Sequence, residues 1–146
     1  MEVRRLLEPV ATALAATRIS DDQLAEIERH LDAMREARED VERLNAHDAA
    51  FHRAVVEATG NETLLTVLEG ISGRTLRARI WRGLVDTRVS DRTLAEHEAI
   101  FRALSVRDAA LSQAAALLHV SNTEQWLKEH LRSGEALPWG MTTSGG

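Results

Sequence analysis

Four residues in this sequence are of types that together could hold a metal ion: Asp48, His52, His97 and His119. Each falls on the apolar side of a stretch with helical periodicity, where a carboxylate or an imidazole is costly to bury without a partner. One divalent ion would satisfy all four side chains at once. The residue types therefore predict a metal site made of one inward-facing Asp and three inward-facing His.

The spacing of these residues supports a shared site. Asp48 and His52 are four residues apart and are therefore neighbours on one helix. His97 falls near the middle of an apolar stripe on a second helix, and His119 lies beside Trp126 on a third. A single His is more often a surface or core residue than a ligand, and an Asp and a His four apart can form a simple hydrogen-bonded pair. Both of these plainer interpretations stay open.

The predicted ligands, one Asp and three His, limit which metal ions could bind. Imidazoles with one carboxylate suit Zn, Ni, Co, Fe or Mn, and with no cysteine in the chain thiolate sites are excluded. Zinc is the first choice, with the other ions as alternatives. Because one carboxylate leaves positive charge on a divalent ion, a small carboxylate could complete the coordination.

Helical periodicity runs through almost the whole chain, and strand alternation is nearly absent. An apolar stripe on the first helix (Val3, Leu6, Leu7, Val10, Ala13, Leu14) and one on the last (Leu111, Ala115, Leu118, Trp126) are expected to face the core. Pro9 predicts a kink or a late start of the first helix. Helix-capping residues and Gly60 mark the boundaries. The expected helices cover about residues 3–18, 20–34, 42–58, 61–84, 90–105 and 108–131.

Composition narrows the function further. A net charge of −5, a pI near 5.7 and 3% aromatic residues argue against a nucleic-acid surface in this chain. No apolar run approaches the roughly 20 residues that cross a bilayer, so we expect a cytoplasmic protein with no membrane contact. One domain is predicted over residues 1–132, followed by a frayed Gly/Ser/Thr-rich tail over 133–146.

Polar residues on apolar faces are candidates to line a cavity. Arg79 and Asn122 occupy such positions on their helices, and Arg4 borders the first stripe four residues before Glu8. Arg can hold a carboxylate through two parallel hydrogen bonds. The plainer interpretations are that Arg4 pairs with Glu8 and that Arg79 reaches solvent. The sequence contains no phosphate-binding Gly-rich loop, GxSxG elbow, HExxH motif or dinucleotide fingerprint.

The order Asp-x-x-Phe-His, then Glu-His, then Leu-His resembles a known family. It is similar to the FCD domain, the effector-binding module of the FadR subgroup of GntR-type bacterial transcription regulators. The resemblance covers residues 2 to about 131, and further segments that carry it are 2–9, 58–61, 96–100 and 103–108.

The resemblance implies an antiparallel all-helical bundle around a metal and effector cavity. It implies that Asp48, His52, His97 and His119 hold a divalent metal, and that a small organic acid binds against it. Arg4 matches a recurrent Arg of the family and is the first choice for an effector contact, with Arg79 and Asn122 as weaker candidates. The resemblance also implies a homodimer that contacts DNA only through an N-terminal winged helix-turn-helix, which this chain lacks.

The prediction is thus a metal-dependent sensing and dimerisation domain rather than an enzyme. One alternative is a metal-dependent hydrolase or hydratase, for which Glu96 or Glu98 would be the only nearby general base. Another is a metal-free structural dimerisation module. The sequence does not specify the metal, the acid, the target genes or the sign of regulation. It also leaves open whether the chain is a fragment of a longer regulator or a standalone domain.

Overall fold

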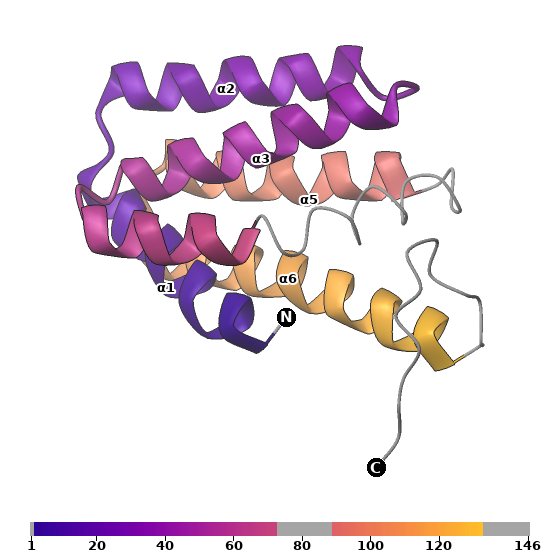
Figure 1. Ribbon diagram of the computed structural model, residues 1–146. Helices are drawn as coiled ribbons and strands as arrows, with labels where there is room; N and C mark the ends of the chain where they lie inside the picture. The colour runs from indigo at the N-terminus through magenta and orange to yellow at the C-terminus, as the bar shows by residue number, and fades with distance from the viewer. Residues whose placement is uncertain (1, 73–88, 133–146) are drawn as a thin grey trace.

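The computed structural model describes residues 2–72 and 89–132, and all regular structure in these ranges is helical (Figure 1). This confirms the all-α fold class. The order of elements is α1 (Glu2–Arg18), α2 (Asp21–Glu36), α3 (Val41–Glu57), helical residues 62–72, α5 (Val89–Ser105) and α6 (Ala109–Arg132).

The helix boundaries follow from the capping residues that the sequence indicates. Ser20 accepts from the backbone N–H of Gln23, and the Gln23 side chain accepts from the backbone N–H of Ser20, which closes the capping box of α2. Asn61 caps the 62–72 helix by accepting from the backbone N–H of Leu64, and Asp108 caps α6 by accepting from that of Leu111. Gly60 has φ +66°, so the turn after α3 is left-handed, as predicted.

The helices form three layers (Figure 1). α2 covers one side, α3 and α5 lie in the middle, and α1, α6 and the 62–72 helix form the opposite side. The core consists of aliphatic side chains around Phe51, with Ile27, Leu31, Ile100 and Leu104 almost fully buried. This arrangement leaves the middle of the bundle to side chains from α1, α3, α5 and α6.

Two ion pairs show that α1 and α6 are antiparallel. Nε of Arg5, near the start of α1, lies 3.6 Å from Oε2 of Glu124 in the second half of α6. At the other end, Nη2 of Arg107, just before α6, lies 2.7 Å from Oδ1 of Asp21, just after α1. The Arg107 guanidinium also donates to the Ile19 carbonyl.

The orientation predicted for the apolar stripes of α1 and α6 is confirmed for Leu7, Ala115 and Trp126, which pack inside the bundle, but was wrong for five others. On α1, Val3, Leu6 and Val10 are 47%, 61% and 57% exposed, and on α6, Leu111 and Leu118 are 51% and 59% exposed. The inner face of α1 instead holds mainly small residues and polar side chains, and that of α6 combines polar side chains with Val120 and Trp126. The physical reason is that these two helices turn their polar site residues toward the bundle interior.

Other expectations were met only in part. α1 begins at Glu2 and continues through Pro9, so the late start was wrong. The predicted continuation of the fourth helix to about residue 84 lies outside the described residues, as does the predicted 133–146 tail. No helix within the described ranges combines the length and apolarity that crossing a membrane requires.

Candidate metal centre and ligand cavity

Asp48, His52, His97 and His119 meet in the middle of the bundle, although they come from three helices. One ligand atom from each of the four lies within 4.8 Å of all the others. Nε2 of His97 lies 2.9 Å from Asp48 Oδ1 and 3.1 Å from His52 Nε2. The structure therefore brings together all four residues of the predicted metal site.

These separations suit a metal ion. Bonds of about 2.0–2.2 Å to His nitrogen and carboxylate oxygen place neighbouring ligand atoms roughly 3 Å apart, and opposite ones somewhat more than 4 Å. His97 is fully buried, and Asp48 and His119 are each 4% exposed. Four convergent donors in so buried a place, with only one negative charge among them, fit a divalent cation.

Hydrogen bonds fix the orientation of two of the imidazoles. Nδ1 of His97 lies 2.7 Å from the Thr93 carbonyl, and Nδ1 of His119 lies 2.8 Å from Glu96 Oε2. Because a carbonyl and a carboxylate can only accept, both Nδ1 atoms carry the proton. Both Nε2 atoms are therefore left with a free lone pair directed at the shared site, which is the arrangement of metal-binding His.

Glu96 is a site residue that the sequence interpretation assigned only to the enzyme alternative. Its carboxylate is buried and accepts from His119 on one oxygen and from the Asn122 amide, at 2.7 Å, on the other. The sequence did contain a signal, because Glu96 shares a helix face with Ile100 and Ala103, both buried. A carboxylate on that face needs a partner inside the bundle.

The protonation of the cluster favours metal binding. Burial lowers the pKa of His52, although the Asp48 carboxylate beside it acts in the opposite direction. Burial, reinforced by His97 and His52, holds the pKa of His119 well below its usual range. Both imidazoles are therefore neutral near pH 7, which is the form that binds a metal.

Arg4 and Glu8 form a buried ion pair beside the cluster. Nη2 of Arg4 lies 3.0 Å from Glu8 Oε2, and the Arg4 side chain is 1% exposed. Burial alone would raise the pKa of Glu8, but Arg4, helped by His52, lowers it. The structure therefore confirms the plainer interpretation, in which Arg4 pairs with Glu8. The Nη1 atom of Arg4 is nevertheless buried with no hydrogen-bond partner among the described residues.

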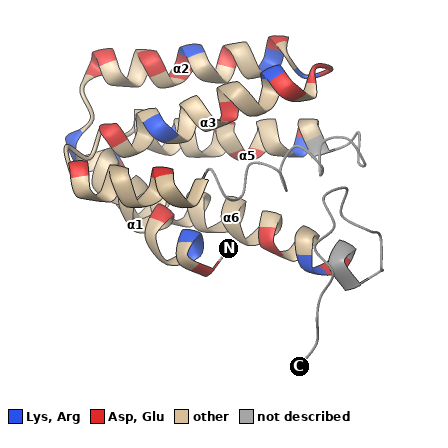
Figure 2. Ribbon diagram, viewed as in Figure 1, with Lys and Arg blue, Asp and Glu red and all other residues tan. Residues whose placement is uncertain are grey.

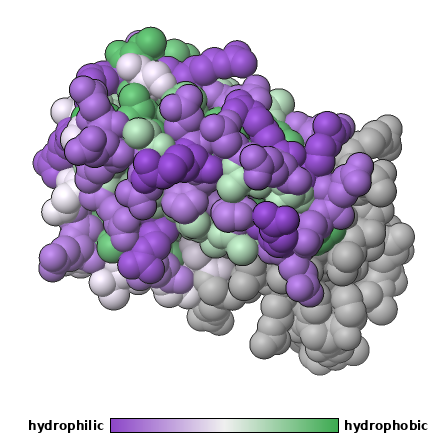
Figure 3. All heavy atoms as spheres, turned by 90° about the horizontal axis from the view of Figure 1, so that it is seen from above, coloured by the Kyte–Doolittle hydropathy of each residue, from purple (hydrophilic) through white to green (hydrophobic). Residues whose placement is uncertain are grey.

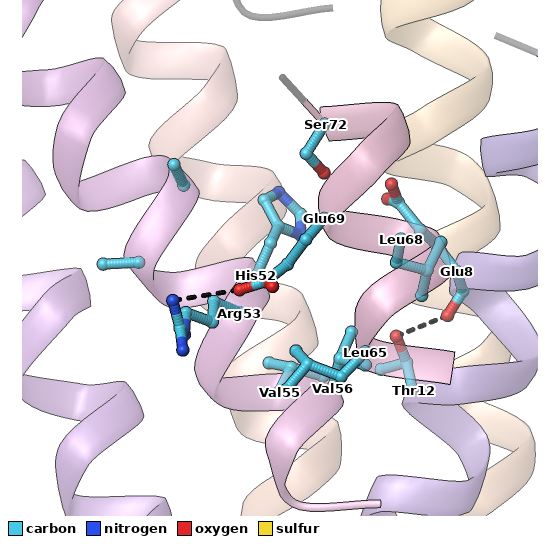
Figure 4. Close-up of a pocket in the computed structure, with 12 residues that line it drawn as sticks. Glu8, Thr12, His52, Arg53, Val55, Val56, Leu65, Leu68, Glu69 and Ser72 are labelled. Carbon is cyan, nitrogen blue, oxygen red and sulfur yellow. Dashed lines mark hydrogen bonds and ion pairs between the residues drawn. The ribbon is translucent and has the colours of Figure 1, made fainter. Parts of the chain in front are cut away.

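A cavity of about 310 Å³ adjoins the cluster at His52 (Figure 4). Glu8 and Thr12 of α1, residues of α3, and Leu65, Leu68 and Glu69 of the 62–72 helix line it. The walls are mainly apolar, with carboxylates at two places. The volume is at the lower end of the range for small-molecule sites, which is about 300–1,000 Å³.

The structure places the three residues predicted to contact an effector in different ways. Arg4 is buried next to the cluster, as described above. The Asn122 amide points to Glu96, so in this structure Asn122 holds a site carboxylate. Arg79 lies outside the described residues.

Comparison with known proteins identifies the family to which this chain belongs. The model of the FCD domain matches residues 1–122. The chain belongs to the FCD domain family. This confirms the resemblance to the effector-binding domains of GntR-type transcription regulators.

Two curated relatives of this FCD domain are regulators. The galactonate operon transcriptional repressor of Escherichia coli K12 is 35% identical over 130 residues, covering 88% of this chain and 56% of that protein. The HTH-type transcriptional regulator LutR of Bacillus subtilis 168 is 33% identical over 132 residues, covering 87% of this chain and 60% of that protein. The chain thus spans somewhat more than half the length of these relatives.

Solved structures agree with the fold. E. coli McbR/YncC superposes with a TM-score of 0.80 at 18% identity, over 89% of this chain and 63% of that one. Streptococcus agalactiae GntR gives a TM-score of 0.72 at 25% identity, over 86% of this chain and 56% of that one.

The relatives of this FCD domain are transcription regulators and not enzymes. This decides against the hydrolase alternative.

Proposed function

We propose that this effector-binding domain senses a small organic acid with the help of a divalent metal ion. The observation that carries the proposal is the convergence of Asp48, His52, His97 and His119 in a buried site that adjoins a cavity at His52. When bound there, the metal would supply a positive centre that attracts an anionic oxygen of the effector. Zinc remains the first choice, with Ni, Mn, Co and Fe as alternatives.

The chemistry around the site supports a carboxylate effector. The buried Arg4 guanidinium has one terminal nitrogen, Nη1, without a partner among the described residues, so this NH2 group can donate to an acid while Arg4 keeps its bonds to Glu8. Glu8 and Glu69 in the cavity wall pair with Arg4 and Arg53, and each carboxylate can accept a further hydrogen bond from a hydroxyl group of an effector. A hydroxylated acid fits this combination, and one relative is named for galactonate, which is a sugar acid.

The helices around the cavity offer a route from effector to DNA. The cavity lies between α1, α3 and the 62–72 helix, so an effector that contacts all three would change their relative packing. In our proposal the domain works as a homodimer in the cytoplasm. It would control the spacing of DNA-binding domains, a winged helix-turn-helix in each subunit, that are not part of the 146 residues.

Calorimetric titration of the zinc-loaded protein with small carboxylates tests this proposal. The panel would contain galactonate, lactate, malate and the uncharged sugar galactose. We expect saturable binding of at least one acid and none of galactose. His97→Ala and His119→Ala should abolish it, while His47→Ala, on α3 but outside the cluster, should not. Failure of every acid to bind, or undiminished binding in His97→Ala and His119→Ala, would refute the proposal.

A further inference from the structure

The charged residues that line the cavity are divided between a buried end and an exposed end. At the buried end, the Glu8 and His52 side chains are 9% and 17% exposed. Arg53 of α3 and Glu69 of the 62–72 helix line the same cavity, but their side chains are 58% and 44% exposed. Within the described residues, the cavity therefore runs from the candidate metal centre toward solvent, with Arg53 and Glu69 at its outer end.

Arg53 and Glu69 form an ion pair at this outer end. Nη1 of Arg53 lies 2.9 Å from Glu69 Oε1, and this contact joins α3 to the 62–72 helix (Figure 4). Nε of Arg53 also donates to Glu57 on its own helix, at 2.8 Å. Because two carboxylates share one guanidinium, this group of three side chains carries a net negative charge.

The Arg53–Glu69 pair differs from the ordinary ion pairs of the surface. Arg35 and Asp32, for example, pair on α2, whose outer face is mostly hydrophilic (Figure 3). Such exposed pairs contribute little and need no functional explanation. Arg53 and Glu69, by contrast, both line a cavity that adjoins the candidate metal centre. The 62–72 helix itself has two Glu and no Lys or Arg (Figure 2), so it adds negative charge to this end.

We propose that the Arg53–Glu69 pair selects the effector by its far end, where it accepts a hydroxyl group and excludes a second carboxylate. This assignment rests on the proposed function, in which one carboxylate of the effector binds at the metal and Arg4. It narrows the class of effector to monocarboxylic hydroxy acids and assigns the selection to one pair of residues.

A hydroxyl group suits the outer end of the cavity. Each carboxylate oxygen has more than one lone pair, so Glu69 can accept from a hydroxyl while it stays paired with Arg53. The hydroxyl oxygen can in turn accept from Arg53, whose guanidinium has N–H donors beyond those used on Glu57 and Glu69. Between the two ends, apolar side chains of the wall can contact the carbon chain of the effector; these are Val55, Val56, Leu65 and Leu68.

A second carboxylate is disfavoured in either position that it could take at this end. Beside Glu69 it would place two like charges next to each other, which costs free energy. Against Arg53 it would have to displace Glu69, and the Glu69 carboxylate would then lose its partner. Like charges and unpaired charges are a common means by which a binding site rejects the wrong ligand.

Calorimetric titration of the zinc-loaded protein with two pairs of acids tests this selection. Lactate and malate form a short pair, and galactonate and galactarate form a long one; in each pair the diacid differs by a carboxylate at the far end. For the pair whose monoacid binds more tightly, we expect the diacid to bind at least about 10-fold more weakly. Glu69→Gln should bring the two dissociation constants to within about threefold, because a neutral amide does not repel the second carboxylate.

Glu62→Gln is the matched control for Glu69→Gln. Glu62 is an exposed residue of the same helix, and it is not among the described residues that line the cavity. The two variants change the net charge by the same amount, but Glu62→Gln should leave the ratio of the two dissociation constants within about twofold of wild type. Far-UV circular dichroism and zinc content verify that both variants are folded and loaded with metal.

Each outcome decides a different question. If no acid binds to the wild type, the sensing proposal fails and this selection fails with it. If acids bind but the diacid binds as tightly as its monoacid or more tightly, the selection alone is overturned. A preference for the monoacid that Glu69→Gln leaves intact, or that Glu62→Gln removes to the same degree, would also overturn the role of the Arg53–Glu69 pair and leave the sensing proposal unaffected.

Discussion

At the scale of single residues, Glu96 should control the metal affinity without binding the metal. Its carboxylate accepts from His119 Nδ1 and thereby directs Nε2 at the site. Glu96→Gln replaces that carboxylate by a neutral amide, whose carbonyl is a weaker acceptor. We expect the zinc dissociation constant, measured by competition with a chelating dye, to rise about 10- to 100-fold.

Glu98→Gln is the matched control for Glu96→Gln. Glu98 is on the same helix, two residues further on, and pairs at the surface with Arg35 and Arg102. Its replacement should leave zinc affinity unchanged. The absorption spectrum of the Co²⁺ form provides a second measurement, because a reoriented His119 changes the ligand field. Equal zinc affinities and equal Co²⁺ spectra in both variants would show that Glu96 does not position His119.

The lowered pKa values of His52 and His119 predict how the metal-free protein responds to pH. In the unfolded chain both imidazoles titrate near 6.5, whereas the folded state resists protonation. The unfolded state therefore binds more protons below that pH, and the free energy of unfolding must fall as pH drops from 7.5 to 5. Urea denaturation in the presence of a chelator measures this slope.

Variants identify the source of the pH slope. His119→Gln removes a titrating group and should flatten the decline between pH 7.5 and 5. Equal stability of the metal-free wild type at both ends of this range would contradict the cause assigned to the pKa shifts.

At the scale of elements, the turn between α3 and the 62–72 helix depends on one glycine. Gly60 has φ +66°, and a Cβ added there would meet no atom within 4 Å, so only backbone strain opposes a side chain. Gly60→Ala should lower the free energy of unfolding by about 1–2 kcal/mol in thermal or urea denaturation.

Gly70 provides the opposite case in the next helix. It lies in the 62–72 helix, and a Cβ there also meets nothing within 4 Å. Gly70→Ala should raise the free energy of unfolding by about 0.5–1 kcal/mol, because alanine loses less backbone entropy in a helix. If Gly60→Ala and Gly70→Ala changed the free energy of unfolding in the same direction, the left-handed turn at Gly60 would be contradicted.

At the scale of the whole molecule, the metal should act as a clamp on three helices. Asp48 and His52 come from α3, His97 from α5 and His119 from α6. An ion that binds only the folded state stabilises it by about 2.7 kcal/mol at 100 times its dissociation constant. For a chain of this size we expect zinc to raise the Tm by about 5–10 °C, and a chelator to reverse the shift.

Thermal denaturation with and without zinc measures the clamp, with His97→Ala as the control. That variant should unfold at the same temperature in zinc and in chelator. A zinc-independent Tm in the wild type would favour the metal-free dimerisation module, which the sequence left open as an alternative.

Much of this molecule follows from local sequence. Periodicity and caps such as Ser20 and Asp108 predict most helix boundaries to within a few residues, since a cap satisfies backbone groups of its own helix. The four residues of the candidate site are also recognisable, because inward-facing Asp and His need a common partner. Each of these features depends only on the spacing of residues within its own helix.

Only the tertiary structure decides how each helix is rotated against its neighbours. Helical periodicity shows that α1 has an apolar side, but not that Val3, Leu6 and Val10 on this side face outward while Arg4 and Glu8 face inward. Periodicity likewise places Glu96 on a buried face without naming Asn122 and His119 as its partners. These contacts join residues more than 20 positions apart, so the packing of the bundle determines them and local propensity does not.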